Sequence, residues 1–174
     1  DLQHTVTFDR NELIISERQE DNGQRYTTVR YNDGEITRQE GSPELPVYPV
    51  HLLVPADVTD FSVTINSQET VTVPLSYTVY PVQTPVPTQI GNTNYPFVAP
   101  DPVIYASSSP YPESAVTIDR DGFFDGNNHI LTLLVSPVQY YPTANSLNFI
   151  KSLSFTVNYD SPAGIGNNRL QIIT

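Results

Sequence analysis

Hydrophobic and polar residues alternate most clearly near the end of the chain, over residues 152–159. The apolar positions there are Leu153, Phe155, Val157 and Tyr159. Successive side chains of a strand point to opposite faces, so this pattern predicts a half-buried strand with one apolar face. The segment 130–135 is apolar on both faces apart from Thr132. It predicts a central strand that is covered on both sides.

Shorter runs of the same kind occur upstream, separated by turn residues. They cover residues 5–8, 13–15, 26–31, 50–54, 61–65 and 71–75. Asn22-Gly23 and Asp33-Gly34 are both two-residue hairpin signals, and the second predicts that 26–31 pairs with 35–40. No segment predicts a helix. Many short strands among 16 prolines favour an all-β fold, an antiparallel β-sandwich of jelly-roll type.

A proline-rich connection runs through residues 80–112, with aromatic residues spaced along it. A connection this long inside a compact domain is typically functional or disordered. Its aromatic residues predict that it is held against the surface of the sandwich. We expect one domain over residues 1–160, followed by a linker over 161–174 that is rich in Gly, Asn and Pro.

The composition excludes several classes of function. The chain has no cysteine, which removes thiol nucleophiles, disulfides and thiolate metal sites. Its net charge of −11 argues against nucleic acid and anionic membrane surfaces as partners. No segment approaches the roughly 20 apolar residues that span a bilayer, so no membrane insertion is expected. The chain starts at Asp1 without a signal peptide, which we interpret as a processed or truncated start.

Acidic residues gather in one segment, at Asp119, Asp121 and Asp125. Carboxylates close to glycines suit Ca²⁺, although the spacing does not match an EF-hand loop. The alternative is a solvated acidic turn without metal. No other cofactor is expected.

No catalytic residues are expected in this chain. The histidines His4, His51 and His129 fall in different predicted strands, and no nucleophile motif accompanies them. The 11 tyrosines on a sandwich also fit a second class of function. This alternative is a non-catalytic, secreted or surface binding module for adhesion or for glycans.

Several proline-containing motifs carry a resemblance to a known family. They are Gly41-Ser42-Pro43-Glu44-Leu45-Pro46, Tyr111-Pro112, and Pro137-Val138-Gln139-Tyr140-Tyr141-Pro142 followed by Leu147 and residues 152–157. In order and approximate spacing, this set resembles the N-terminal propeptide of gingipain-type cysteine peptidases, peptidase family C25. The resemblance covers residues 20–160.

The resemblance implies a β-sandwich that precedes a caspase-like cysteine peptidase catalytic domain, which is its partner. It implies an inhibitor and folding assistant of a secreted zymogen, exported through the periplasm to the cell surface and removed by cleavage. It also implies an inhibitory loop that offers a basic side chain to the specificity pocket of the peptidase. Arg120, flanked by Asp119 and Asp121, is the candidate for that loop, and an arginine balanced by two acids is the alternative. Arg169 is the candidate processing site.

Overall fold

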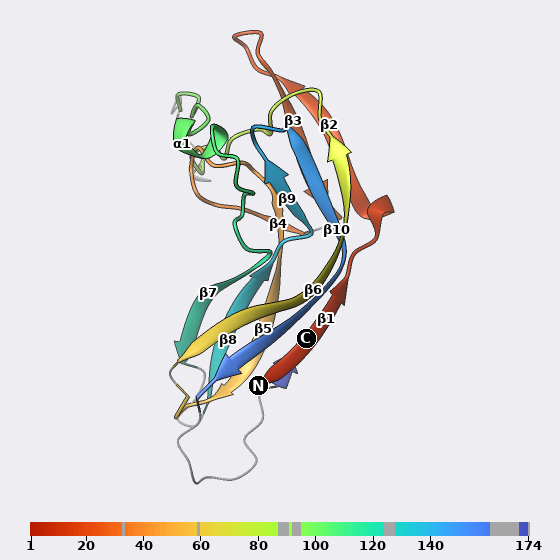
Figure 1. Cartoon of the computed structure of the whole chain (residues 1–174). Helices are drawn as coiled ribbons and strands as arrows, with labels where there is room; N and C mark the ends of the chain where they lie inside the picture. Colours follow the sequence, from red (N-terminus) through yellow and green to blue (C-terminus); the bar gives the residue numbers. More distant parts are fainter. Residues whose placement is uncertain are drawn as a thin grey trace.

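The computed structural model describes residues 1–32, 34–58, 60–86, 91, 95–123, 128–160 and 171–173, with the backbone only at 120, 121 and 123. The described part is almost entirely β, and every ladder between its strands is antiparallel, which confirms the predicted fold class (Figure 1). The finer jelly-roll assignment stays a prediction. No helix in the described part is long and apolar enough to cross a bilayer.

One sheet is organised by β10, a strand of 14 residues. β10 pairs with β6 along one side. On its other side it pairs with β9 near its start and with β1 further along. The bounds are β1 Leu2–Thr7, β6 Phe61–Pro74, β9 Val138–Tyr141 and β10 Ser146–Tyr159. The sequence predicts two strands at 61–65 and 71–75, whereas the structure has one continuous strand, β6. Two register shifts against β10 accommodate the polar stretch between them.

The facing sheet has the order β11-β5-β8-β7, and the short strand β4 also pairs with β5. The bounds are β4 Glu35–Ile36, β5 Pro46–Pro55, β7 Val116–Phe123, β8 Asn128–Val135 and β11 Gln171–Ile173. Gln171–Ile173 therefore belongs to this sheet, although the sequence assigns it to a linker. Residues 161–170 of that expected linker lie outside the described residues.

A separate hairpin is formed by β2 Leu13–Gln19 and β3 Arg25–Tyr31. It packs against the N-terminal end of β10. The sequence pairs β3 with 35–40 instead, and this prediction is wrong. The turn at Gly23, with φ of +83°, joins β2 to β3, and β4 pairs with β5. Two short helices complete the described part, the 3-10 helix η1 Arg10–Glu12 and the one-turn α1 Pro102–Tyr105.

The core consists of two hydrophobic clusters. The first lies between the two sheets and contains Leu133 of β8 and Phe155 of β10, both buried. The second lies between the hairpin β2–β3 and the β9–β10 end, and contains Val29 and Phe149. The predicted apolar face of 152–159 packs into the first cluster, and β8 is central in its sheet, as the pattern indicates.

Candidate functional site

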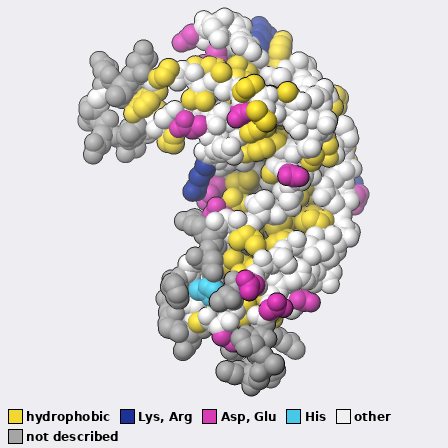
Figure 2. All heavy atoms as spheres, turned by 60° about the vertical axis from the view of Figure 1, so that its left-hand side comes forward, with side chains coloured by type: hydrophobic (Ala, Val, Ile, Leu, Met, Phe, Trp, Pro, Cys, Tyr) yellow, Lys and Arg dark blue, Asp and Glu magenta, His cyan; other side chains and the backbone are white. Residues whose placement is uncertain are grey.

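The molecule is curved, and its concave side holds a groove with a volume of about 550 Å³ (Figure 2). The floor of the groove is the outer face of the sheet β5-β8-β7. Strand alternation produces this floor, because Leu131, Leu133 and Val135 of β8 enter the core while Thr132, Leu134 and Ser136 point outward.

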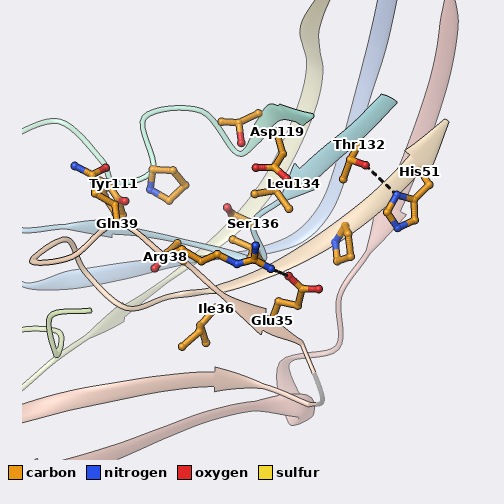
Figure 3. Close-up of a pocket in the computed structure, with 15 residues that line it drawn as sticks. Glu35, Ile36, Arg38, Gln39, His51, Tyr111, Asp119, Thr132, Leu134 and Ser136 are labelled. Carbon is orange, nitrogen blue, oxygen red and sulfur yellow. Dashed lines mark hydrogen bonds and ion pairs between the residues drawn. The ribbon is translucent and has the colours of Figure 1, made fainter. Parts of the chain in front are cut away.

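One wall of the groove is the segment 35–39, which starts in β4 and leaves the sheet after Ile36. Arg38 extends along this wall and forms an ion pair with Glu35, at 2.9 Å (Figure 3). His51 on the floor shares a hydrogen bond of 3.1 Å with Thr132. The groove is therefore lined by paired polar groups and by apolar side chains, among them Ile36, Val47 and Leu134, a mixture that is typical of surfaces that bind other proteins.

The proline motif at 41–46 holds this wall in place. Gly41 has φ of +78°, a conformation that favours glycine, and a side chain there would approach the carbonyl oxygen of Ala99 at 3.4 Å. The Ser42 hydroxyl donates to the carbonyl oxygen of Gln39 at 2.6 Å. The Thr37 hydroxyl donates to the carbonyl oxygen of Pro43 at 2.8 Å. The motif at 41–46 thus positions the wall of the groove, and none of its residues lines the groove itself.

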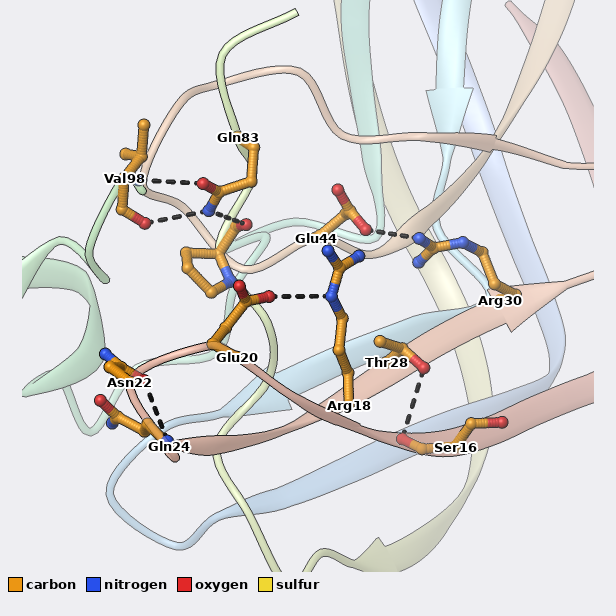
Figure 4. Close-up of polar contacts among 11 residues, drawn as sticks. Ser16, Arg18, Glu20, Asn22, Gln24, Thr28, Arg30, Glu44, Gln83 and Val98 are labelled. Carbon is orange, nitrogen blue, oxygen red and sulfur yellow. Dashed lines mark hydrogen bonds and ion pairs between the residues drawn. The ribbon is translucent and has the colours of Figure 1, made fainter. Parts of the chain in front are cut away.

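Charged residues of the hairpin β2–β3 lie next to the same motif (Figure 4). Arg30 forms an ion pair with Glu44 at 2.5 Å, and the Glu44 side chain is only 10% exposed. Arg18 bonds Glu20 at 2.8 Å, and its guanidinium lies 4.5 Å from the centre of the Tyr80 ring. Burial, and secondarily a hydrogen bond with Glu20, raise the pKa of Tyr80 to about 12.

The proline-rich connection is held against this end of the molecule, as its aromatic residues predict. The Tyr105 hydroxyl donates to the carbonyl oxygen of Val79 at 2.6 Å, and burial raises the pKa of Tyr105. Tyr111 exchanges two backbone hydrogen bonds with Tyr140, of 2.7 and 2.8 Å. Residues 87–90 and 92–94 of the connection lie outside the described residues.

The candidate inhibitory residues lie in a strand and not in a loop, which corrects the sequence interpretation. Arg120 pairs with Thr132 of β8, and Asp121 pairs with Leu131. Asp119 falls between the paired positions, where the register shifts, and it lines the groove. These polar residues form a strand because their backbone pairs with the strand β8. Charged residues and a bulge are typical of an edge strand, because they discourage unwanted pairing.

The described residues do not test the proposed calcium ligands. Asp125 lies outside the described residues, and so does the side chain of Asp121. Within the described ranges, no three His, Asp or Glu side chains form a group that could hold a metal ion. Calcium binding stays a prediction, and isothermal titration with Ca²⁺ tests it. Arg169 also lies outside the described residues, so its role as a processing site stays a prediction.

Two parts of the site are missed by the sequence interpretation. The groove combines residues from β4, β5, β7 and β8, and no local pattern indicates that these residues meet. The helix α1 does carry a local signal. Asp101 is its N-cap, and Pro102 stands at the first helical position, a pairing that commonly starts a helix.

Comparisons with known proteins agree with this architecture. The first similar structure concerns the zymogenic latency of gingipain K from Porphyromonas gingivalis. It matches with a TM-score of 0.73 and 22% identity, over 92% of this chain and 87% of that one. The second is a complex of Porphyromonas gingivalis RgpB pro- and mature domains. It matches with a TM-score of 0.72 and 16% identity, over 95% and 82%. These two likenesses show the fold.

No curated protein matches the sequence. A family model does match, and it spans residues 3–174. That family is Propeptide_C25, the propeptides of C25 peptidases, which are non-catalytic domains. The match covers nearly the whole chain, so this chain belongs to the Propeptide_C25 family.

Proposed function

We propose that this chain is the inhibitory pro-domain of a C25-type, gingipain-like cysteine peptidase, and that it also assists the folding of the peptidase. In this proposal, its partner is the caspase-like catalytic domain of the same zymogen. The zymogen is secreted, and it travels through the periplasm to the cell surface. The pro-domain is removed by cleavage, for which Arg169 is the candidate site.

The observation that carries the proposal is the family match over residues 3–174. The structure adds physical support. The domain has a concave side with a groove of mixed polar and apolar lining, and the candidate residues lie on the edge strand beside it. The similar RgpB pro-domain occurs in a complex with its mature domain.

The conformation of β7 suggests how inhibition works. Peptidases bind substrates as extended segments, often by adding a strand to an exposed sheet edge. β7 is the last strand of its sheet, and within the described part no strand pairs with its outer edge. In our proposal β7 enters the cleft of the peptidase in this extended form and offers Arg120. Pairing to β8 holds the chain in place, so that it is a poor substrate.

Inhibition of the mature peptidase domain by the purified chain tests the proposal. We expect saturable inhibition by the wild-type chain. Arg120→Ala should raise the inhibition constant at least about thirtyfold, the loss typical of a central interface residue. Arg25→Ala is the matched control, because Arg25 lies on the hairpin and makes only a long ion pair of 3.7 Å with Glu17.

The outcomes separate two statements. If the wild-type chain does not inhibit the peptidase, the inhibitory role is wrong. If it inhibits and Arg120→Ala inhibits equally well, the assignment of Arg120 is wrong and the role stands. For folding assistance, we expect denatured peptidase to recover more activity when it is refolded together with the pro-domain. Equal recovery without the pro-domain would contradict that part.

A further inference from the structure

Several apolar side chains of the connection that carries α1 are exposed. Val103 of α1 is 80% exposed, the largest value among the exposed large hydrophobic residues of the described part. Three more exposed apolar side chains come from the same connection, Val86, Tyr95 and Phe97. We call these four residues the α1 patch. Figure 2 shows hydrophobic side chains gathered over the upper arm of the concave side.

Val103 is held on a rigid support. The Asp101 carboxylate accepts hydrogen bonds from the backbone nitrogens of Val103, at 2.8 Å, and of Ile104, at 3.2 Å. At the other end of the turn, the Tyr105 ring lies 6.1 Å from that of Tyr140. This capped turn fixes the backbone of Val103 although no residue of α1 is buried. Its exposure therefore does not come from a frayed segment.

The rest of the α1 patch is supported in a similar way. The Phe97 ring packs against Tyr26 at 5.8 Å and Tyr80 at 6.1 Å. The Gln83 side chain bonds both backbone groups of Val98, each at 2.9 Å. Gln83 and Val98 are thus bonded to each other, and Phe97 is packed against the body of the domain. A preorganised apolar surface of this kind loses little conformational entropy when a partner covers it.

The α1 patch is connected to the groove by a short chain of hydrogen bonds. The backbone nitrogen of Asp101 donates to the carbonyl oxygen of Gly41 at 2.9 Å. The next residue, Ser42, bonds the carbonyl oxygen of Gln39, which lines the groove. The segment 39–42 thus links the groove wall to the residue that caps α1.

We propose that the α1 patch is a second contact surface for the mature peptidase domain, with Val103 as its apolar anchor. This inference rests on the proposed function. The partner presents a shallow apolar depression for a branched aliphatic side chain, at a distance from its catalytic cleft. Binding is then divided between β7, which blocks the cleft, and the α1 patch, which fixes the orientation of the pro-domain.

A second copy of this chain is a less suitable occupant. Each copy carries a net charge of −11, so two copies repel each other when their surfaces approach. A zymogen, in contrast, holds the peptidase beside the pro-domain in one chain, which raises the effective concentration of that partner.

Binding of the full 174-residue chain to the mature peptidase domain, with the peptidase nucleophile substituted, tests the inference. We expect Val103→Glu to weaken binding by about tenfold or more, and Val103→Ala by less, because loss of an anchor side chain weakens an interface strongly. Ile14→Glu is the matched control. Ile14 is 54% exposed and lies in β2, on the other side of the molecule from α1 (Figure 1). This control should change the dissociation constant less than about twofold.

Hydrogen exchange of the wild-type chain gives a second readout that needs no variant. The backbone amides of 103–105 should become protected when the peptidase binds. If wild-type binding is tight but Val103→Glu binds equally well and these amides stay unprotected, the inference is overturned and the proposed function stands. If the wild-type chain does not bind the peptidase at all, the proposed function fails and the inference fails with it. A dimer of the free chain that Val103→Glu dissolves would also overturn the inference.

Discussion

The side-chain nitrogen of Gln139 lies 3.0 Å from the carbonyl oxygen of Pro112, to which it donates a hydrogen bond. Its side-chain oxygen accepts a hydrogen bond from Gln68 of β6, at 3.1 Å. Gln139 is nearly buried, so a single side chain ties β9 to β6 and to the end of the proline-rich connection. The glutamine of the Pro-Val-Gln-Tyr motif thus has a structural role, as a buried link between these segments.

Gln139→Leu should therefore destabilise the domain. The substitution keeps the approximate volume, but it leaves the Pro112 carbonyl and the Gln68 amide without this partner. We expect the free energy of unfolding to fall by about 1–3 kcal/mol, as for other buried polar groups that lose a bond. Urea unfolding measures the loss. Gln3→Leu is the control, because the bond of Gln3 to Ser154 is exposed and long, at 3.3 Å. Equal stability of both variants would contradict a role of Gln139 as a link.

The ion pair between Arg30 and Glu44 should matter more than that between Arg38 and Glu35. Glu44→Ala leaves Arg30 with less compensation beside a nearly buried site, and we expect a loss of about 1–3 kcal/mol. Glu35→Ala breaks an exposed pair, and we expect a loss below about 1 kcal/mol. Thermal or urea unfolding of the two variants checks this order. A larger loss for Glu35→Ala would show that burial of Glu44 does not decide the effect.

Tyr80 should contribute to the alkaline limit of stability. Its pKa is raised to about 12 in the folded state, against about 10 for an unfolded tyrosine. The folded state therefore holds this proton more tightly than the unfolded state. Its contribution to stability is complete below about pH 10 and is lost as the pH rises toward 12. Urea midpoints measured across this interval should fall less steeply for Tyr80→Phe than for the wild-type chain. Parallel curves would contradict the assignment.

Much of the fold follows from local alternation in the sequence. The apolar face of β10 predicts its burial correctly. The apolar run of β8 predicts a strand covered on both sides, whereas only the face with Leu131, Leu133 and Val135 enters the core and the other face lines the groove. The partner of β3 does not follow from alternation, because hairpin signals stand on both sides of it, at Asn22-Gly23 and at Asp33-Gly34. Asp33-Gly34 is a good hairpin signal, but β2 offers β3 seven paired positions, and β4 has only two residues in a ladder. Both pairings are local, and the longer ladder decides the arrangement.

The candidate site is less accessible from the sequence. Asp119 and its neighbours are polar and close to glycine, a composition that predicts a loop. Their place in β7 depends on β8, which leaves backbone groups that need an adjacent strand. Hydrophobic periodicity does not predict the helix α1, because a helix of one turn is too short to show a repeat. Only the capping pair of Asp101 and Pro102 indicates it.

The position of β10 in both hydrophobic clusters has a consequence for the degradation of such a domain. It supplies Phe149 to one hydrophobic cluster and Phe155 to the other, six residues away along the same strand. Neither half of the molecule can keep its packing without it. A single peptide-bond cut within β10 would open both clusters together, so a spent pro-domain would pass directly from a complete inhibitor to degradable fragments.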